Sequence, residues 1–272
     1  MTHELCASIQ LGCHELSNAE HHADSAVGFS TLSLLGTPEK YTPAKYHERK
    51  PIEQSDAMTV GTVAHMLVYE PELAEDAFAV RPVKEDGSLH GTNTNIYKAW
   101  LADVAPGKII VTPKIMEEAT AIRETIAASE IYYKYATANQ ILMCEASFFW
   151  TDPETGIKCK IRPDCLRLSS TGRLINEDLK TCPDPAPWEF QWAIRDYQIL
   201  RRLAWYRTGL RAITGEDSDQ CIIAVGKAHR ACAIYQANEI NLDAAEHVNH
   251  EMLRRLADGA KPADWQREVQ FI

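Results

Sequence analysis

The chain has 272 residues and a formal net charge of −10, with 45% hydrophobic and 24% charged residues, which is ordinary for a globular protein. An acidic chain is poorly suited to general binding of nucleic acid, so contact with phosphates would need basic residues concentrated in one place. No run of about 18 apolar residues occurs, and we therefore expect no transmembrane helix.

The eight cysteines are scattered and form no Cys-x-x-Cys pair, which argues against a zinc ribbon or an iron–sulfur cluster. The stretch MTHELCASIQLGCHEL lacks a basic region followed by an apolar core, so no secretory signal is expected. Both features favour reduced thiols in a cytoplasm.

The first half of the chain predicts helices. Residues 1–28 are polar and rich in histidine, but their acids and histidines lack metal-ligand spacing, so we expect a solvated or mobile segment (His14, Glu20, His21, His22, Asp24). Residues 29–46 predict a short helix with Ser30 as N-cap and Pro38 at its end. Residues 58–69 predict an apolar helix closed by Pro71. The next stretches predict irregular structure over 73–107, a strand over 109–111 and an amphipathic helix over 115–129.

The second half predicts a sheet and its covering helices. The expected elements are strands over 141–151, 157–168 and 174–181, a long helix over 188–213, a hairpin of 221–226 with 231–237, and a helix over 242–256. We see no linker, and therefore expect one α/β domain over 1–272, with an N-terminal helical elaboration and a core at about 140–240.

The segment INEDLKT, residues 175–181, places two carboxylates and a lysine close together. In a strand, alternate side chains share a face, so Asp178 and Lys180 point one way while Glu177 and Leu179 point the other. Asp164 ends the preceding strand, and antiparallel pairing would bring it beside Asp178. Two adjacent carboxylates repel unless a cation lies between them, and Mg²⁺ takes oxygen ligands of this kind.

This arrangement suits hydrolysis of a phosphodiester. Mg²⁺, or Mn²⁺ in its place, held by Asp164 and Asp178 would polarise a phosphate oxygen and activate a water. Lys180 would orient that water or stabilise the developing charge. A strand-end salt bridge between Asp178 and Lys180, with Asp164 in a turn, explains the same spacing, so the residues alone leave both interpretations open.

Two further residues are ambiguous from the sequence. His65 is a lone histidine on an apolar helix, where a core histidine is the usual explanation, although Gly61 on the same face leaves room for close approach. Glu145 lies within an apolar predicted strand, where a carboxylate is costly unless it is paired, at an edge, or near a metal.

The long helix over 188–213 concentrates positive charge in five arginines: Arg195, Arg201, Arg202, Arg207 and Arg211. Gln198, Arg202 and Tyr206 recur every four residues and form one stripe of the helix. We interpret this helix as the local basic patch that an acidic DNA-binding protein would need. An ordinary solvated helix face explains the same pattern.

The motif Pro163-Asp164…Asp178-Leu179-Lys180 resembles that of the PD-(D/E)xK nuclease superfamily. The chain is most similar to the RecE-type branch, which comprises exodeoxyribonuclease VIII and its prophage-encoded relatives. The resemblance covers about residues 28–240, and further stretches that carry it are 30–41, 61–65 with 70–71, 148–164 and 190–209.

The resemblance implies a restriction-endonuclease-like α/β core, with a mixed central sheet flanked by helices. It implies a Mg²⁺-dependent exonuclease that digests linear double-stranded DNA from its ends, 5′ to 3′, and leaves single strands for phage-type recombination. It also implies a ring-shaped homo-oligomer, a trimer or tetramer, that acts with a single-strand annealing protein in the cytoplasm of a bacterial host cell.

The resemblance also assigns roles to residues. The metal ligands would be His65, Asp164, Asp178 and the backbone carbonyl of Leu179. Lys180 would act on the water, and Glu145 would support the site or bind a second metal. DNA contacts would come from Gln198, Arg202, Tyr206 and Arg195. Glu177 is left out of the site.

One departure bears on activity. Arg202 stands where related nucleases carry a glutamine, and an arginine would either hold a phosphate or disturb the metal environment. Three other functions therefore stay open: a structure-specific endonuclease of the same superfamily, a catalytically weak DNA-binding recombination partner, and a metal hydrolase unrelated to DNA.

Overall fold

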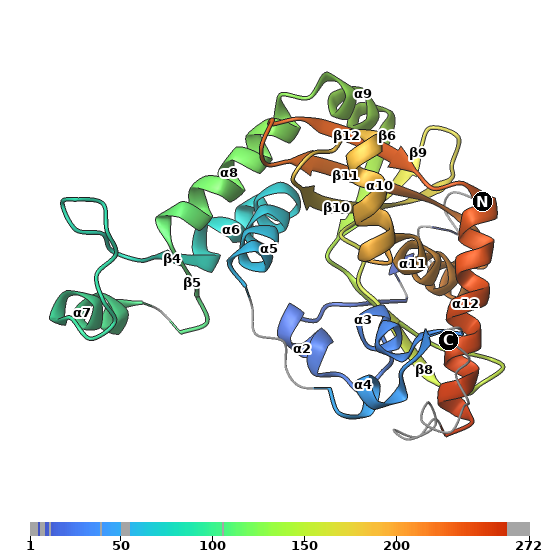
Figure 1. The fold of residues 1–272 in the computed structure, drawn as a ribbon. Coiled ribbons are helices and arrows are strands. Elements are labelled where there is room, and N and C mark those ends of the chain that lie inside the picture. Colours follow the sequence, from blue (N-terminus) through green and yellow to red (C-terminus); the bar gives the residue numbers. More distant parts are fainter. Residues whose placement is uncertain are drawn as a thin grey trace.

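The computed structural model describes residues 5, 9–10, 12–38, 40–49, 55–104 and 106–259 (Figure 1). Its centre is a five-stranded sheet in the order β12-β11-β10-β9-β6. These strands are β6 (Asn139–Cys144), β9 (Cys165–Ser169), β10 (Leu174–Cys182), β11 (Ser218–Gly226) and β12 (Cys232–Gln236). The central strand β10 runs parallel to β11 and antiparallel to β9, so the sheet is mixed.

The two neighbours of β10 pair with it over different lengths. The ladder with β11 runs the full strand, from Leu174 opposite Ser218 to Cys182 opposite Gly226. The ladder with β9 stops where Glu177 lies opposite Cys165. From Asp178 onward, β10 therefore presents its backbone to the segment that leads into β9, and a polar site can form there.

Helices cover both faces of this sheet (Figure 1). On one face lie α5 (Asp56–Tyr69) and α8 (Pro113–Ala127), whose apolar side chains bury Leu179 and its neighbours on β11. On the other lie α10 (Pro187–Asp196), α11 (Ile199–Thr214) and α12 (Glu239–Ala257). A strand covered on both faces is apolar on both, which explains the nearly continuous apolar run of β11.

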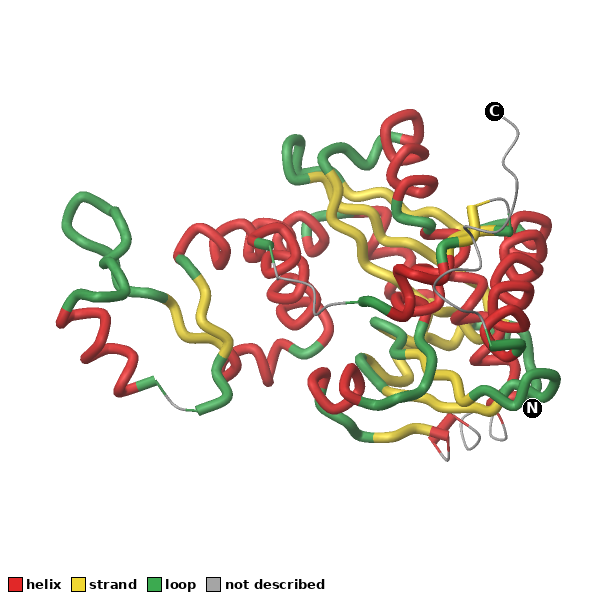
Figure 2. Tube along the Cα trace, turned by 60° about the horizontal axis from the view of Figure 1, so that its bottom comes forward, coloured by secondary structure: helices red, strands yellow, loops and turns green. Residues whose placement is uncertain are grey.

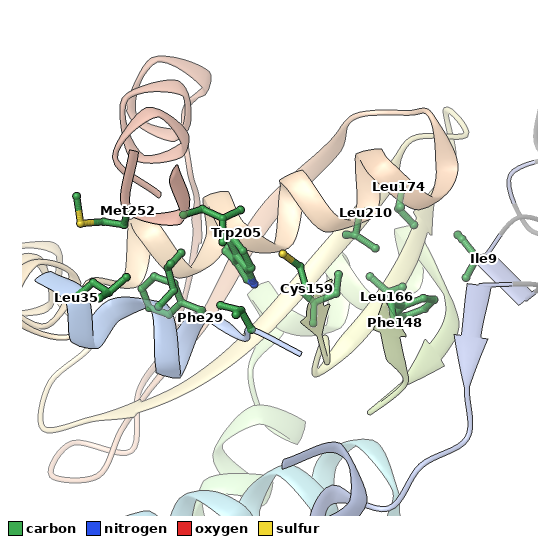
Figure 3. Close-up of a cluster of buried hydrophobic side chains, with 14 of the residues drawn as sticks. Ile9, Phe29, Leu35, Phe148, Cys159, Leu166, Leu174, Trp205, Leu210 and Met252 are labelled. Carbon is green, nitrogen blue, oxygen red and sulfur yellow. The ribbon is translucent and has the colours of Figure 1, made fainter. Parts of the chain in front are cut away.

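A second sheet packs under α11. It has the order β1-β7-β8, formed by β1 (Cys13–His14), β7 (Ser147–Thr151) and β8 (Lys158–Ile161). The N-terminal elements cover it: α2 (Asn18–Ala23), α3 (Phe29–Leu32), the 3-10 turn η1 (Ser33–Leu35), β2 (Gly36–Thr37), β3 (Lys40–Tyr41) and α4 (Pro43–His47). Figure 3 shows the apolar cluster between them, where Phe148, Trp205 and Leu210 lie against N-terminal residues.

The segment between α5 and α8 projects from this body as an arm (Figures 1 and 2). It contains α6 (Pro71–Ala77), the parallel pair β4 (Phe78–Val80) and β5 (Ile109–Val111), and α7 (Asn95–Asp103). Helix α7 buries none of its residues. No helix in the described part of the chain is long and apolar enough to span a bilayer.

Several sequence predictions are confirmed. The mixed sheet flanked by helices is the expected α/β class. Helix α5 ends before Pro71, β5 occupies 109–111, and α8 buries its predicted face (Ile115, Ala119, Ile122, Ile126). The hairpin β11–β12 and the last helix are also present.

Three predicted elements are each divided in two. The strand over 141–151 breaks at Glu145, and the helix over 188–213 breaks at Gln198; both residues have a positive φ, 50° and 52°. The strand over 157–168 breaks at residues 162–164, where the chain leaves the small sheet for the large one and Pro163 has no N–H to donate. The first and third breaks meet, since the Glu145 N–H donates to the Asp164 carbonyl at 3.1 Å.

Other predictions were incomplete. Residues 73–107 contain most of α6 and all of β4 and α7 rather than irregular structure alone, and α9 (Glu130–Ala138) was not predicted. Neither α7 nor α9 has a fully buried residue, so neither carries the strongly apolar core face that marks α8. The helix over 29–46 is split, and its N-cap is Gly28 rather than Ser30, because the helix already begins at Phe29.

The N-terminal segment makes more contacts than its polarity suggests. Ser17 caps α2 in a reciprocal capping box with Glu20. His21 is buried and its Nδ1 lies 3.0 Å from the Ser147 hydroxyl, while His22 and Asp24 stay exposed. The mobility of residues 1–28 stays a prediction, and it includes positions 1–4, 6–8 and 11, outside the described residues.

Candidate active site

The edge of β10 beyond its ladder with β9 gathers the predicted site residues. Asp164 Oδ2 accepts a hydrogen bond of 2.7 Å from the backbone N–H of Leu179. Asp164 therefore lies beside Asp178, as antiparallel pairing of the two strands predicted. Its side chain is 12% exposed, so Asp164 does not lie in a solvent turn.

Asp178 and Lys180 point to the same side of β10, as strand alternation predicted. Lys180 Nζ lies 2.5 Å from Asp178 Oδ2 and donates to the carbonyl of Leu179 at 3.0 Å. Asp178 is almost completely buried. The salt bridge between Asp178 and Lys180 that the sequence left open is therefore present. It lies next to a second largely buried carboxylate, that of Asp164.

His65 reaches this edge from α5, which covers the face of the sheet opposite to the one that Asp178 and Lys180 face. Its Nε2 lies 3.0 Å from the carbonyl oxygen of Leu179. Its Nδ1 lies 3.4 Å from Asp164 Oδ2 and 3.6 Å from Glu145 Oε1. The imidazole thus contacts two acidic side chains and a backbone carbonyl, which a core histidine on an apolar helix would not need.

Glu145 reaches the site because the chain kinks there. Its left-handed backbone separates β6 from β7, and its N–H donates to the Asp164 carbonyl at 3.1 Å. Its Oε2 accepts a 3.0 Å hydrogen bond from Arg162 Nε. Arg162 supplies the pairing that a buried carboxylate requires, and sequence reasoning missed it, although a charged residue next to Pro163-Asp164 was a visible signal.

The electrostatics of the site show crowded negative charge. Burial and the nearby Asp178 raise the pKa of Asp164 to about 6, although His65 acts in the opposite direction. Burial lowers the pKa of His65, but Asp164 and Glu145 outweigh it, and the net pKa is raised. Burial raises the pKa of Glu145, but the hydrogen bonds and charges of His65 and Arg162 outweigh burial, and the net pKa is lowered. A bound cation would relieve the repulsion among these carboxylates.

The donor atoms fit a hard divalent cation. Ligand atoms of His65, Glu145 and Asp164 all lie within 4.8 Å of one another. The Leu179 carbonyl adds an oxygen 3.0 Å from His65 Nε2. Adjacent ligands of an octahedral Mg²⁺ or Mn²⁺ ion lie about 3 Å apart. The remaining predicted ligand, Asp178, adjoins this group, but its Oδ2 faces Lys180.

Helix α11 contributes two of the four predicted DNA-binding residues to the site. Tyr206 donates its hydroxyl to the Arg162 carbonyl at 3.0 Å. Arg202 lies one turn before Tyr206 on the same helix; burial lowers its pKa, but the charges of Asp178, Tyr206 and Asp164 raise it overall. Gln198 instead accepts from Arg201 and precedes the helix rather than continuing its stripe.

The predicted arginine patch is smaller than expected. Arg201 is buried and donates to Asn249 and to the Gly36 carbonyl. Arg207 and Arg211 form ion pairs with acids of α12 and of the loop after α11 (Asp243, Glu246, Asp217). These three arginines serve the fold, because the charges of Arg207 and Arg211 are paired and Arg201 donates to uncharged acceptors. The two remaining arginines are Arg202 and Arg195. Arg195 is exposed, stacks on the Trp192 ring at 4.5 Å and forms an ion pair with its neighbour Asp196 at 3.0 Å.

A second buried network lies behind the site. Glu177 is fully buried and forms an ion pair with Arg167. Its Oε1 accepts hydrogen bonds from the hydroxyls of Tyr69 at 2.8 Å and Tyr132 at 3.1 Å. Burial and the Glu177 charge raise the pKa of both tyrosines, so both hydroxyls stay protonated and donate. Sequence reasoning separated Glu177 from the site but found none of these partners.

Comparison with known proteins places this site in a family. The model of a PDDEXK-like domain of unknown function (DUF3799) matches residues 28–265, which include every residue of the candidate site. The chain belongs to this PDDEXK-like family. Its mixed core is that of the PD-(D/E)xK nuclease superfamily, and the match does not single out the RecE-type branch.

One solved structure supports the fold of this PDDEXK-like domain. The chain is similar to the crystal structure of a Eubacterium rectale protein named “Putative exonuclease”, with a TM-score of 0.58 and 15% identity over 95% of this chain and 96% of the other. A second structure, of the protein named SSO0001, aligns with a TM-score of 0.31 and 13% identity over 78% and 82% of the two chains. No curated protein matches the chain.

Proposed function

We propose that the protein is a Mg²⁺-dependent exonuclease that degrades linear double-stranded DNA from its ends. The observation that carries this proposal is the edge of β10, where Asp164, Asp178 and Lys180 meet His65 and the Leu179 carbonyl. Membership of the PDDEXK-like family supports hydrolysis of a phosphodiester. The name of the similar E. rectale protein supports an exonuclease over other nucleases.

The metal ligands in this proposal are His65, Asp164, Asp178 and the Leu179 carbonyl. A divalent cation held by them would polarise a non-bridging phosphate oxygen and lower the pKa of a bound water. Glu145 supports the site, because its carboxylate lies between Arg162 and His65 and orients the imidazole.

Lys180 acts on the attacking water and on the charge that develops at phosphorus. Asp178 and the Leu179 carbonyl hold its ammonium group at the same edge as the ligands. A fixed positive charge in a partly buried site stabilises a developing negative charge better than a mobile solvent does. The DNA backbone is held by Arg202 and Tyr206 of α11, by Arg195 of α10, and by Gln198 between the two helices.

The wider biological role rests on the resemblance to RecE-type nucleases. We propose 5′-to-3′ digestion that leaves a 3′ single strand, a ring-shaped homo-oligomer, and cooperation with a single-strand annealing protein in phage-type recombination. A cytoplasmic location follows from that role.

Digestion of linear duplex DNA tests the proposal. With Mg²⁺, the wild type is expected to shorten the linear duplex and to leave covalently closed circular plasmid intact, and a chelator should stop the reaction. Lys180→Ala should reduce the rate at least about a hundredfold. Lys98→Ala, on the exposed arm helix α7, removes an equal charge far from β10 and should leave the rate unchanged.

Each other outcome points to a different function. Cleavage of the closed circle would favour a structure-specific endonuclease. Binding of DNA without cleavage would favour a recombination partner, for which Arg202 beside Asp178 and Asp164 is the relevant structural feature. Equal rates for the wild type and Lys180→Ala would overturn the role of Lys180.

A further inference from the structure

Glu177 connects the two elements that must meet for the metal site to form. It lies on β10, two residues before Leu179, and accepts the hydroxyl of Tyr69 on α5 at 2.8 Å. Tyr69 lies one helical turn after His65, whose Nε2 faces the Leu179 carbonyl at 3.0 Å. We propose that Glu177 and Tyr69 are positioning residues that set the place of His65 on β10 and thereby the affinity for the metal, an inference that rests on the proposed function.

The distance between the two contacts is about the same along α5 as along β10. Four residues of an α-helix rise about 6 Å, and two residues of a strand rise about 6.6 Å. Helix α5 and strand β10 run in opposite directions, because His65 contacts Leu179 and the later Tyr69 contacts the earlier Glu177. The two contacts are nearly equally spaced along the helix and along the strand. A shift of the helix along the strand would break both contacts together.

Apolar packing alone does not set this position. The fully buried residues of α5 are Val60, Val63 and Ala64, and all of them precede His65, while the apolar residues from Met66 to Val68 are only partly buried against the same cluster. Apolar contacts are non-directional and tolerate a small displacement along a strand. After His65, the directional contact from α5 to β10 is the hydrogen bond that Tyr69 donates to Glu177.

The carboxylate itself is held on its other side. Arg167 of β9 donates from Nε to Glu177 Oε2, from Nη1 to the Asn139 carbonyl at 3.0 Å, and from Nη2 to the Tyr132 hydroxyl at 2.9 Å. These bonds prevent rotation of the Glu177 carboxylate, and hydrogen bonds to a charged acceptor away from water are strong. Tyr69 is thus anchored to a rigid acceptor.

The chain offers a matched pair of variants. Tyr69 and Tyr132 donate to the same oxygen, Glu177 Oε1, but only Tyr69 lies on the helix that carries His65. Tyr69→Phe and Tyr132→Phe each remove one hydroxyl from that oxygen, and Tyr132→Phe also removes the acceptor of an Arg167 hydrogen bond, which makes it the more demanding control. Tyr69→Phe also keeps its ring edge-on to the His65 imidazole, at 6.1 Å between centroids.

The experiment measures Mn²⁺ binding by calorimetry without DNA, alongside the melting temperature and Mg²⁺-dependent cleavage. Tyr69→Phe should weaken Mn²⁺ binding about tenfold, a loss typical of removing a partner that orients a metal ligand. Saturating Mg²⁺ should restore most of its cleavage rate. Tyr132→Phe should bind Mn²⁺ within about twofold of the wild type, although it should melt at a lower temperature than Tyr69→Phe because it loses the Arg167 hydrogen bond as well.

The outcomes separate this inference from the proposed function. Equal changes in Mn²⁺ affinity in both variants, or no change in either, would overturn the positioning role. A wild type that binds no Mn²⁺ would overturn it as well, since no metal site would exist to be tuned. A wild type that binds Mn²⁺ but cuts no DNA would refute the nuclease, and the contrast between the two tyrosines would still decide the positioning role.

Discussion

The acidic groups on the two sides of strand β10 differ in how completely their charges and hydrogen bonds are satisfied. Behind the strand, Glu177 is fully buried, and Arg167, Tyr69 and Tyr132 satisfy both of its oxygens. At the open edge, Asp164 and Asp178 lie side by side with less compensation, and burial with mutual repulsion raises the pKa of Asp164 to about 6. A completed polar network stabilises one structure, whereas an incomplete one is free to bind something else.

The largest expected effect comes from the open edge. Asp164→Asn keeps an oxygen that accepts from Leu179 N–H, but removes a metal ligand and a negative charge. Cleavage should fall about a thousandfold, or roughly 4 kcal/mol of transition-state stabilisation, without loss of metal-free stability in urea unfolding. Asp103→Asn, exposed on α7, is the matched control. A clear loss of metal-free stability in Asp164→Asn would show that this edge is structural.

The next effect comes from the buried side. Arg167→Ala leaves the Glu177 carboxylate buried without its counter-charge, and should lower the free energy of unfolding by about 3–5 kcal/mol. Combining Arg167→Met with Glu177→Leu should recover only part of this loss, because the apolar pair removes the unpaired charge but leaves the Tyr69 and Tyr132 hydroxyls without their acceptor. Urea unfolding measures both, and a loss below about 1 kcal/mol for Arg167→Ala would contradict the closed-network description.

The sequence predicted the open edge better than the buried side. Asp164, Asp178 and Lys180 follow from two local rules, strand alternation and antiparallel pairing of consecutive strands. The environment of Glu177 depends on side chains from α5, α9 and β9, which no periodicity brings together. Alternation could place Glu177 on the other face, but could not show which residues would meet it there.

His65 and Glu145 illustrate what long-range packing adds. His65 lies 114 residues before Leu179 in the chain, so its place at the edge follows from the docking of α5 and not from spacing. Glu145 reaches the site through a left-handed backbone, which residues other than glycine rarely adopt and patterns do not reveal. For both residues, the resemblance to a nuclease family supplied the prediction.

Metal binding should distinguish the two sides thermodynamically. A ligand that binds only the folded state at a hundred times its dissociation constant stabilises that state by about 2.7 kcal/mol. Mg²⁺ or Mn²⁺ should therefore raise the stability of the wild type and of Arg167→Ala, and a chelator should reverse the gain. Thermal unfolding of Asp164→Asn should show little gain, and an equal gain there would place the metal elsewhere.

The buried His21 in the N-terminal segment should make the stability of the fold depend on pH. Burial, with the charges of Lys160 and Arg162, lowers the pKa of His21 to about 4. Because the unfolded chain then binds more protons between pH 6.5 and 4, stability should fall as the pH drops through this range, by about 2 kcal/mol at pH 5. His21→Gln should remove this dependence, and a constant difference from the wild type between pH 5 and 7 would contradict it.

The smallest expected effect concerns the two kinds of arginine on α11. Arg202 lies by the open edge, whereas Arg207 is paired with Asp243 and Glu246. Arg202→Gln, made in Asp164→Asn so that DNA stays intact, should weaken duplex binding about fivefold and reduce the salt dependence by about one phosphate contact. Arg207→Gln should lower stability and leave the salt dependence unchanged. Equal salt dependence in both variants would mean that Arg202, like Arg207, serves the fold, and the phosphate contacts would then have to lie on another element.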